Sequence, residues 1–401
     1  KMHWWLRVAN TLVVLLSIIC YIVLSRLGVG IPFPVQPFSS MHPVLPESSL
    51  HVVAELDIPP GNLAVSSKNR IFFNFHPEYN PNPIKIAELT SKSTFKPFPS
   101  LNFQNDIVTC LSMRIDSRDR LWLLDFAQHG IGGNPKILGF QLSDGEESDI
   151  PVVKHTFPTH VAGFGSMLND FQIDPTGETI YIVDTSIVGQ NPGIIIFSIQ
   201  DNRSYRVLSS DSRLFGRSFF LNVSGFSLRF GPLGFKIHVD SVALDRDGDI
   251  LYFGPVTGEN LYAASTRELR SNNFTEVGVS LVAEDKPASD GMSSDAAGNL
   301  WITCIESSSL ALALPGPSPR KIIKVIESRK YLRWPDGLSF GPDGLYITNS
   351  ALHLHMEALF SGRPSPPVDK RPYHIMLLPT QALRQLASEL GQDFQMPTSG
   401  Q

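Results

Sequence analysis

The sequence predicts an all-β fold, a six-bladed β-propeller preceded by an N-terminal hydrophobic signal or anchor segment. Three observations predict it. A short hairpin motif occurs six times, the copies are spaced by about the length of a four-stranded blade, and sustained helical periodicity is lacking between the N-terminal segment and a short run near the C-terminus. Pro and Gly are frequent, with 31 and 30 among 401 residues, which suits one large β domain with many turns.

The first segment, residues 1–28, has a basic flank followed by an apolar run from residue 8 to residue 24. This pattern is typical of a secretory-pathway signal, and the run is close to the roughly 20 residues of a full membrane span. We expect a signal peptide or a signal anchor here, and the lack of a small-x-small cleavage site after Leu24 favours the anchor. The propeller is therefore predicted to be secreted, or anchored through residues 8–24 with the propeller on the lumenal or extracellular side.

Three further segments complete the predicted organisation: a Pro-rich linker at 29–50, the propeller at 51–380, and a C-terminal tail with a short helix at 381–401. Three Asn-x-Ser/Thr sequons fit the secretory assignment, because such sites are glycosylated on the lumenal side. The predicted glycosylation sites are Asn202, Asn222 and Asn273.

Each copy of the motif is predicted to be a β-hairpin. A turn residue, usually Asp, caps its own backbone, Gly supplies a positive φ, and flanking aromatic and branched residues suit a pleated sheet. The turns open at Ser66, Asp116, Asp174, Asp245, Asp295 and Gly341. The intervals of 50, 58, 71, 50 and 46 residues predict one blade per copy. The longest interval holds a surface excursion over residues 208–236.

Several phrases, in this order, resemble the major royal jelly protein and Yellow family, and more specifically its microbial members related to dopachrome tautomerase. They are Pro59 to Val65, Arg70 to Phe75, Asp119 to Asp125, Leu168 to Asp170, Ser289 to Met292 and Trp334 to Ser339. The resemblance covers about residues 52–379. It implies a secreted propeller whose central channel accepts small molecules, with biogenic-amine binding and dopachrome conversion among the activities of the family. Fold carries over from such a resemblance better than function.

An acidic ring is predicted at the channel mouth. Five residues before each turn opener, where the innermost strand of a blade begins, stand Gly61, Leu111, Asn169, Asp240, Asp290 and Asp336. Pseudo-sixfold symmetry would aim these side chains at one axis, where clustered carboxylates need a cation, a proton or an amine to neutralise them. Asn169, Asp240, Asp290 and Asp336 are the candidate ligand-binding residues and also the candidate metal ligands, and their oxygen atoms suit calcium.

Other side chains are weaker candidates for chemistry. Asp170 is the candidate general base, because proton abstraction needs a carboxylate within reach of the substrate. Asn349 and Ser350 are candidate ligand contacts, near where amine-binding relatives place polar groups. The histidines that follow blade strands, among them His76 and His129, are interpreted as solvated loop residues.

Three functions remain open. The first is a propeller that binds or isomerises an aromatic amine or catechol-derived molecule, acting as a dopachrome-tautomerase-like isomerase if it is an enzyme. The second is a calcium-dependent lactone or ester hydrolase of the gluconolactonase or paraoxonase type, against which Gly61-Asn62 stands where such enzymes carry a metal-binding Glu. The third is a non-catalytic interaction propeller. We expect a monomer with a small-molecule ligand, and a net charge of −5 gives no nucleic-acid-binding signature.

Overall fold

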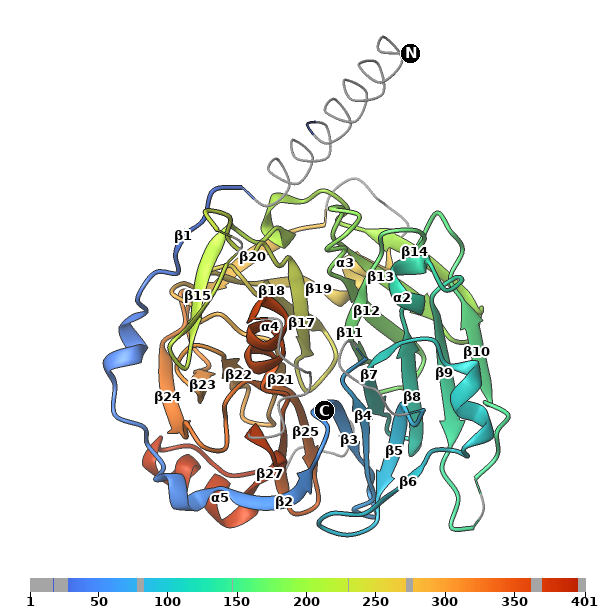
Figure 1. The fold of residues 1–401 in the computed structure, drawn as a ribbon, viewed down its shortest axis with the longest axis horizontal. Helices are drawn as coiled ribbons and strands as arrows, with labels where there is room; N and C mark the ends of the chain where they lie inside the picture. Colours follow the sequence, from blue (N-terminus) through green and yellow to red (C-terminus); the bar gives the residue numbers. More distant parts are fainter. Residues whose placement is uncertain are drawn as a thin grey trace, which may run out of the picture.

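Antiparallel sheets dominate the structure. The computed structural model describes residue 17 and residues 28–77, 83–145, 147–229, 231–271, 277–361 and 370–395. Within these ranges the strands form six four-stranded sheets and one three-stranded sheet. The four-stranded sheets are arranged around a common centre (Figure 1).

The first three four-stranded sheets are continuous in sequence. They consist of β3 (Pro60–Val65), β4 (Ile71–Phe75), β5 (Ile86–Leu89) and β6 (Phe95–Pro97); of β7 (Cys110–Ile115), β8 (Arg120–Asp125), β9 (Lys136–Gln141) and β10 (Val153–Thr156); and of β11 (Leu168–Ile173), β12 (Thr179–Asp184), β13 (Gly193–Ser198) and β14 (Arg203–Val207).

The fourth and fifth sheets follow the same up-and-down order. They consist of β17 (Val239–Leu244), β18 (Ile250–Pro255), β19 (Leu261–Ser265) and β20 (Val279–Ala283), and of β21 (Met292–Ser294), β22 (Leu300–Cys304), β23 (Ser309–Ala313) and β24 (Ile322–Glu327). The sixth sheet joins both ends of the domain, because the early strand β2 (His51–Leu56) pairs with β27 (Tyr373–Pro379), next to β26 (Gly344–Asn349) and β25 (Pro335–Gly341). This pairing closes the ring.

The six predicted hairpins are present, and each joins the first two strands of a four-stranded sheet. Asp116 shows the predicted capping, since its Oδ1 accepts the backbone N–H groups of Arg118 and Arg120, both at 3.0 Å. Three residues after each opener φ is positive, and the residues there are Asn69, Asp119, Gly177, Gly248, Gly298 and Gly344. The positive φ predicted for these turns is therefore present in all six, supplied by Gly in four of them and by Asn69 and Asp119 in the first two.

The apolar core lies between adjacent sheets. Trp122 of β8 packs in one cluster with Phe171 and Ile182 of the next sheet, and Phe72 of β4 packs in another with Met113 of β7. The aromatic residues expected to pack in this way are at most 2% exposed; they are Trp122, Tyr181, Trp301 and Tyr346. The first strand of each sheet contacts the first strand of the next, and β25 contacts β3, so these strands form a closed ring.

The 208–236 excursion forms the three-stranded sheet. Here β15 (Phe219–Val223) pairs with β16 (Phe226–Leu228), and β1 (Ile31–Pro32) adds to β15 in parallel. From β1 the chain runs along the outer side of the ring to β2, drawn in blue in Figure 1, and hydrogen-bonds to β24 through Leu45 N and Val325 O at 2.8 Å. Residues 29–50, interpreted from sequence as a linker, therefore pack against the ring of sheets.

The helices are short and lie at the ends or edges of the sheets. They are the 3-10 turns η1 (Pro37–Ser40), η2 (Glu47–Ser49), η4 (Asn102–Asp106) and η5 (Ser212–Leu214), and the helices α2 (Ala127–Gly130), α3 (Thr266–Arg270), α4 (Leu352–Ser361) and α5 (Thr380–Glu389). None of the helices in the described ranges is both long enough and apolar enough to cross a membrane. Apart from residue 17, the apolar run 8–24 lies outside those ranges.

Candidate functional site

A cavity of about 340 Å³ opens at the end of the ring where the first strand of each sheet begins. Five of the six predicted ring positions line it, namely Leu111, Asn169, Asp240, Asp290 and Asp336. At the sixth position the neighbouring residue, Asn62, lines the cavity in place of Gly61. The structure thus brings the predicted ring residues together around one space.

Strand irregularities explain why polar residues face this cavity. The ladder register shifts at the ring position in β3, β7, β11, β17 and β25. Such a bulge puts an extra residue on one strand and re-aims its side chains. In β11 the shift lies between Leu168 and Phe171, so that the consecutive residues Asn169 and Asp170 both line the cavity.

Glycines let the strands come close at the axis. A Cβ on Gly291 would overlap the carbonyl oxygen of Asp336, and a Cβ on Gly337 would lie 2.9 Å from Asn62 Cα. The Asp-Gly pairs at 290–291 and 336–337 therefore combine a carboxyl group with the small residue that the crowded axis requires.

Asp240 and Asp290 form a hydrogen-bonded carboxyl pair. Asp240 Oδ1 also accepts hydrogen bonds from Asn169 Nδ2 and, at 3.0 Å, from Thr185 Oγ1. Asp290 Oδ2 accepts the indole N–H of Trp334 at 2.5 Å. Burial raises the pKa of both carboxyls, and the charge of Asp290 raises the pKa of Asp240 further. The two carboxyls therefore titrate as a coupled pair, and a proton is held by the pair more tightly than by an isolated carboxyl.

Asp336 is the third carboxyl at this end of the cavity. Burial and then the charge of Asp290 raise the pKa of Asp336 well above its usual value, while a hydrogen bond from Ser350 acts in the opposite direction. Asp240 is buried and Asp290 and Asp336 are half-buried at this end of the cavity, and a cation entering it would relieve the repulsion among the three carboxyls.

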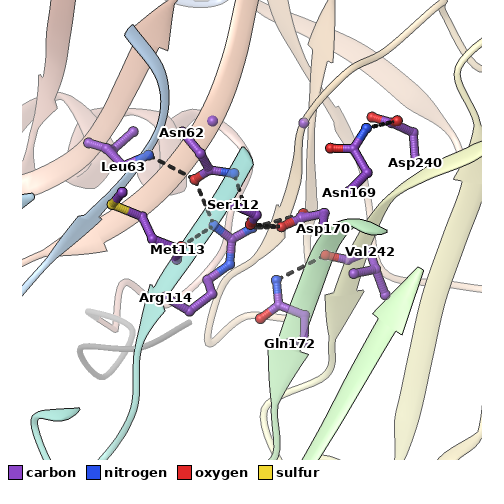
Figure 2. A network of polar contacts seen from close by, with 12 residues as sticks. Asn62, Leu63, Ser112, Met113, Arg114, Asn169, Asp170, Gln172, Asp240 and Val242 are labelled. Atoms are coloured by element: carbon purple, nitrogen blue, oxygen red, sulfur yellow. Dashed lines mark hydrogen bonds and ion pairs between the residues drawn. The ribbon is translucent and has the colours of Figure 1, made fainter. Parts of the chain in front are cut away.

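Asp170, the predicted general base, is held in a buried polar network (Figure 2). Both of its oxygens accept from Arg114 Nη2 at 2.9 Å, and Oδ1 also accepts from Ser112 Oγ at 2.8 Å. Arg114 Nη1 donates to Asn62 Oδ1 at 3.0 Å, which ties β3, β7 and β11 together. With its oxygens occupied in this way, Asp170 is suited to positioning the ring strands rather than to abstracting a proton.

Asn349 and Ser350, predicted to contact a ligand, are fully buried and do not line the cavity. Asn349 Oδ1 accepts the backbone N–H of Trp334 at 2.9 Å, as a cap at the end of β26. Ser350 acts on the cavity indirectly, through its hydrogen bond to Asp336.

The other cavity walls are largely apolar. Val188, Phe235, Val256, Leu352 and Met356 contribute to them, the last two from one face of α4. In Figure 1, α4 lies over the centre of the ring. The cavity therefore combines an acidic end with apolar walls, which suits a small amphiphilic ligand.

Several cavity residues were not predicted. Arg114 lies just before a hairpin turn, and Trp334 begins one of the family motifs. Their contacts with Asp170 and Asp290 are hydrogen bonds between different sheets, which the sequence does not indicate. His129 was interpreted as a solvated loop residue, yet it is half-buried and belongs to the cavity lining. The sequence carried no signal for Arg114, because it alternates with Met113 and Ile115 along the strand, and such alternation usually places a charged residue on the solvent face.

The described residues contain no group of three or more His, Cys, Asp or Glu side chains arranged to hold a metal ion. The carboxylate oxygens of the proposed calcium site instead accept hydrogen bonds, as those from Thr185 and Trp334 show. This donor set fits a proton or an organic cation better than calcium, which needs several free oxygen ligands.

Two of the three sequons lie in the described chain. Asn202 and Asn222 are both exposed, and the Oδ1 atom of Asn202 lies 2.9 Å from His155 Nδ1. The third, Asn273, lies outside the described residues.

Sequence comparison relates the chain to one family. The family model described as "Major royal jelly protein" matches residues 108–350. Major royal jelly protein 3 of Apis mellifera is 25% identical over 197 residues, which are 45% of this chain and 34% of that protein. Protein yellow of Drosophila melanogaster is 28% identical over 181 residues, which are 43% of this chain and 32% of that protein. The matched regions span less than half the length of these relatives.

Structural comparison shows the fold. A luciferin-regenerating enzyme superposes with a TM-score of 0.52 at 11% identity, covering 82% of this chain and 94% of that one. Regucalcin from Agrobacterium tumefaciens, a calcium-binding protein, gives 0.51 at 13% identity, covering 84% and 95%. These similarities support a β-propeller and, at such low identity, extend to the fold alone.

Proposed function

Because this chain belongs to the major royal jelly protein family, we propose that it is a six-bladed β-propeller whose central cavity binds a small organic cation, an aromatic amine or a catechol-derived molecule. The six four-stranded sheets would be the blades. The observation that carries the proposal is the convergence of Asp240, Asp290 and Asp336 at one end of a cavity whose remaining walls are apolar apart from a few polar side chains such as Arg114 and Lys236.

The acidic end supplies the recognition. A protonated amine placed there would form charge-assisted hydrogen bonds, which are about twice as strong as neutral ones. It would also offset the repulsion that raises the carboxyl pKa values. An aromatic ring would then lie against the apolar walls, where Val256 and Leu352 are among the lining residues.

The carboxyl pair also has the chemistry for isomerisation. A tautomerisation removes a proton from one atom of a molecule and returns a proton to another, with no change in oxidation state. The coupled pair of Asp240 and Asp290 can hold a proton on one carboxyl while the other accepts one, so the pair suits that exchange. Catalysis by the pair requires that the cavity binds the ligand, so binding is tested first.

We further propose that the propeller resides in the secretory pathway or outside the cell. The basic flank and apolar run at residues 1–24 and the exposed sequons at Asn202 and Asn222 support this location.

The test is calorimetric titration of the protein with dopamine, comparing the wild type with Asp290→Asn. The amide keeps an oxygen to accept the Trp334 N–H but lacks the charge. We expect the substitution to weaken binding at least about tenfold, or ~1.4 kcal/mol, as expected for loss of a charge-assisted hydrogen bond. The matched control is Asp247→Asn. Asp247 lies in the exposed turn that follows β17, at the end of this strand away from the cavity. Equal affinities of the wild type and Asp290→Asn would remove Asp290 from the site.

A further inference from the structure

A second cavity, of about 300 Å³, lies beside the three-stranded sheet, away from the central cavity. The strand β1 pairs with β15 only at Ile31 and Pro32, and the chain then leaves β15 and continues toward β24. The cavity occupies the gap that opens where the two segments separate. Residues 32–39 line one side of it, and Phe220 and Asn222 line it from β15.

Alternation along β15 places two of these residues on one face of the strand. Phe219, Leu221 and Val223 are buried in a single apolar cluster, whereas Phe220 is half-buried and Asn222 is exposed. Side chains two residues apart on a strand point to the same side. The ring of Phe220 and the amide of Asn222 are therefore neighbours on the outer face of β15, at the rim of the cavity.

Asn222 opens the sequon Asn222-Val223-Ser224, which runs into the hairpin turn between β15 and β16. The turn residues Ser224 and Gly225 both have positive φ, as two-residue hairpin turns require. Asn222 and Ser224 are both exposed, so the sequon is accessible. A glycan attached to Nδ2 of Asn222 would therefore start at the rim of the cavity.

The cavity offers the kinds of surface that a sugar needs. A pyranose ring has an apolar face that packs on aromatic and apolar side chains, and polar groups that need hydrogen-bond partners. Pro34 and Phe38 contribute apolar walls, and Glu306 contributes a carboxyl. Glu306 is half-buried and accepts the backbone N–H of Asn222 at 2.6 Å, which holds this carboxyl next to the attachment point.

The ring of Phe220 is fixed without a sugar. The guanidinium group of Arg229 lies 5.4 Å from its centroid. A Cβ on Gly30 would lie 2.3 Å from Phe220 Cε1, so the ring packs directly against the backbone of β1 and its approach. A side chain that is already ordered loses little entropy when a ligand packs on it, which favours binding.

We propose that an N-linked glycan at Asn222 places its first N-acetylglucosamine in this cavity, against Phe220 and Glu306, and so fastens residues 32–39 to the three-stranded sheet. In the modification, Nδ2 of Asn222 loses a proton and bonds to C1 of the sugar, which leaves the pyrophosphate of a lipid-linked oligosaccharide donor. The inference rests on the proposed secretory location and is independent of the central cavity.

The test is hydrogen exchange of the full chain, made in a secretory host that adds high-mannose glycans, with the occupancy of each sequon measured by peptide mass spectrometry. Asn222→Gln removes the glycan and keeps the backbone N–H that donates to Glu306. We expect amides in residues 33–41 to exchange at least about fivefold faster in this variant, because a lost contact raises the population of the locally open state. Exchange in β13, in a distant sheet, should not change.

Two controls isolate the docked sugar. In full chains made in a bacterial host that adds no N-linked glycan, Asn222→Gln should leave exchange of residues 33–41 unchanged. In the Phe220→Leu background, glycosylated as before, the effect of Asn222→Gln should fall by at least about half, because the two substitutions remove one contact. If Phe220→Leu does not fold, an endoglycosidase that leaves one N-acetylglucosamine on each Asn replaces it. The trimmed wild type should keep its slower exchange relative to trimmed Asn222→Gln.

The outcomes separate this inference from the proposed location. Equal exchange in the glycosylated wild type and Asn222→Gln, or an effect of the same size with and without Phe220, would overturn docking. An unmodified Asn222 in a protein that carries a glycan at Asn202 would overturn the inference and leave the secretory location standing. Absence of glycan from every sequon would contradict both.

Discussion

At the scale of single residues, the carboxyl groups at the acidic end of the cavity lower the stability of the folded protein. Asp240 is buried and Asp290 and Asp336 are half-buried, and removal from water raises the pKa of each. Apolar or amide side chains at these positions would make the folded state more stable. Clusters that lower the stability of a protein in this way are common at sites of binding or catalysis.

Substitution Asp240→Asn is therefore expected to stabilise the protein at neutral pH. The folded protein raises the pKa of this carboxyl, so the folded state binds more protons than the unfolded state between the two pKa values, and stability falls as pH rises through that window. Each unit of pKa increase corresponds to about 1.4 kcal/mol. The amide retains Oδ1 as acceptor for Thr185 and can donate to Asp290 as the protonated acid does.

Thermal unfolding of the wild type and Asp240→Asn, followed from about pH 4 to about pH 8, measures this effect. The gain from the substitution should be small at the acid end and grow with pH. A variant that is less stable at every pH would show that the Asp240 carboxylate contributes favourably to the fold.

The acidic residues could be predicted from the sequence, whereas their partners could not. Each of them stands five residues before a recognisable turn, as Asp240, Asp290 and Asp336 show. Because the hairpin fixes the strand register, this spacing predicts which side chains meet at the axis. The pairing of Arg114 with Asp170 depends on a bulge in each of two strands from different sheets. Bulges leave no reliable signal in one sequence, so the ion pair of Asp170, the candidate general base, with Arg114 could not be predicted.

At the scale of elements, the hairpins are the best-specified part of the chain. The opener Asp residues do more than cap the turn, since the indole N–H of Trp122 donates to Asp116 at 2.8 Å and that of Trp301 donates to Asp295 at 3.0 Å. Local turn chemistry and the packing between sheets therefore support one another, which is the consistency expected of a well-specified fold.

Long-range pairing of elements was not predicted. β2 closes the sixth sheet with β27, and β1 extends the sheet of the 208–236 excursion. Residues 29–50 look like a linker because Pro is frequent and periodicity is absent, yet Phe38 and Leu45 are at most 3% exposed. A partner that is distant in sequence supplies the missing signal, and pattern reading within a short window does not detect it.

The left-handed turn at 127–130 allows a test at this scale. Gln128 is exposed, has φ of 50°, and hydrogen-bonds through its backbone, donating its N–H to Thr109 Oγ1 and accepting the N–H of Ile131. Gln128→Gly removes a conformational cost of about 1–2 kcal/mol and adds about 0.5–1 kcal/mol of chain entropy to the unfolded state. A net gain in stability of about 0.5 kcal/mol is therefore expected in chemical denaturation.

Gln128→Ala is the matched control, because it removes the same side chain without relieving the backbone. It should be neutral or slightly destabilising relative to the wild type. If the Gly variant were no more stable than the Ala variant, the strain attributed to this turn would be absent.

At the scale of the whole molecule, the ring of sheets brings side chains from distant segments to one axis. Asn62 and Asp336 are far apart in sequence yet line the same cavity, as do His129 and Asp290. Family membership could be recognised from ordered motifs, and the fold follows from it. The identity of the ligand does not, because relatives with one fold differ in the residues that contact small molecules.

The central claim is that the cavity binds an organic cation through carboxyls that share protons. Calorimetric titration of the wild type with dopamine at about pH 5 and about pH 8, each in two buffers of different protonation enthalpy, tests it most directly. The amine is protonated throughout this range, while the raised carboxyl pKa values leave protons to be displaced. The account predicts tighter binding at the higher pH with release of protons to the buffer. Absence of binding, or an affinity independent of pH with no proton exchanged, would contradict it.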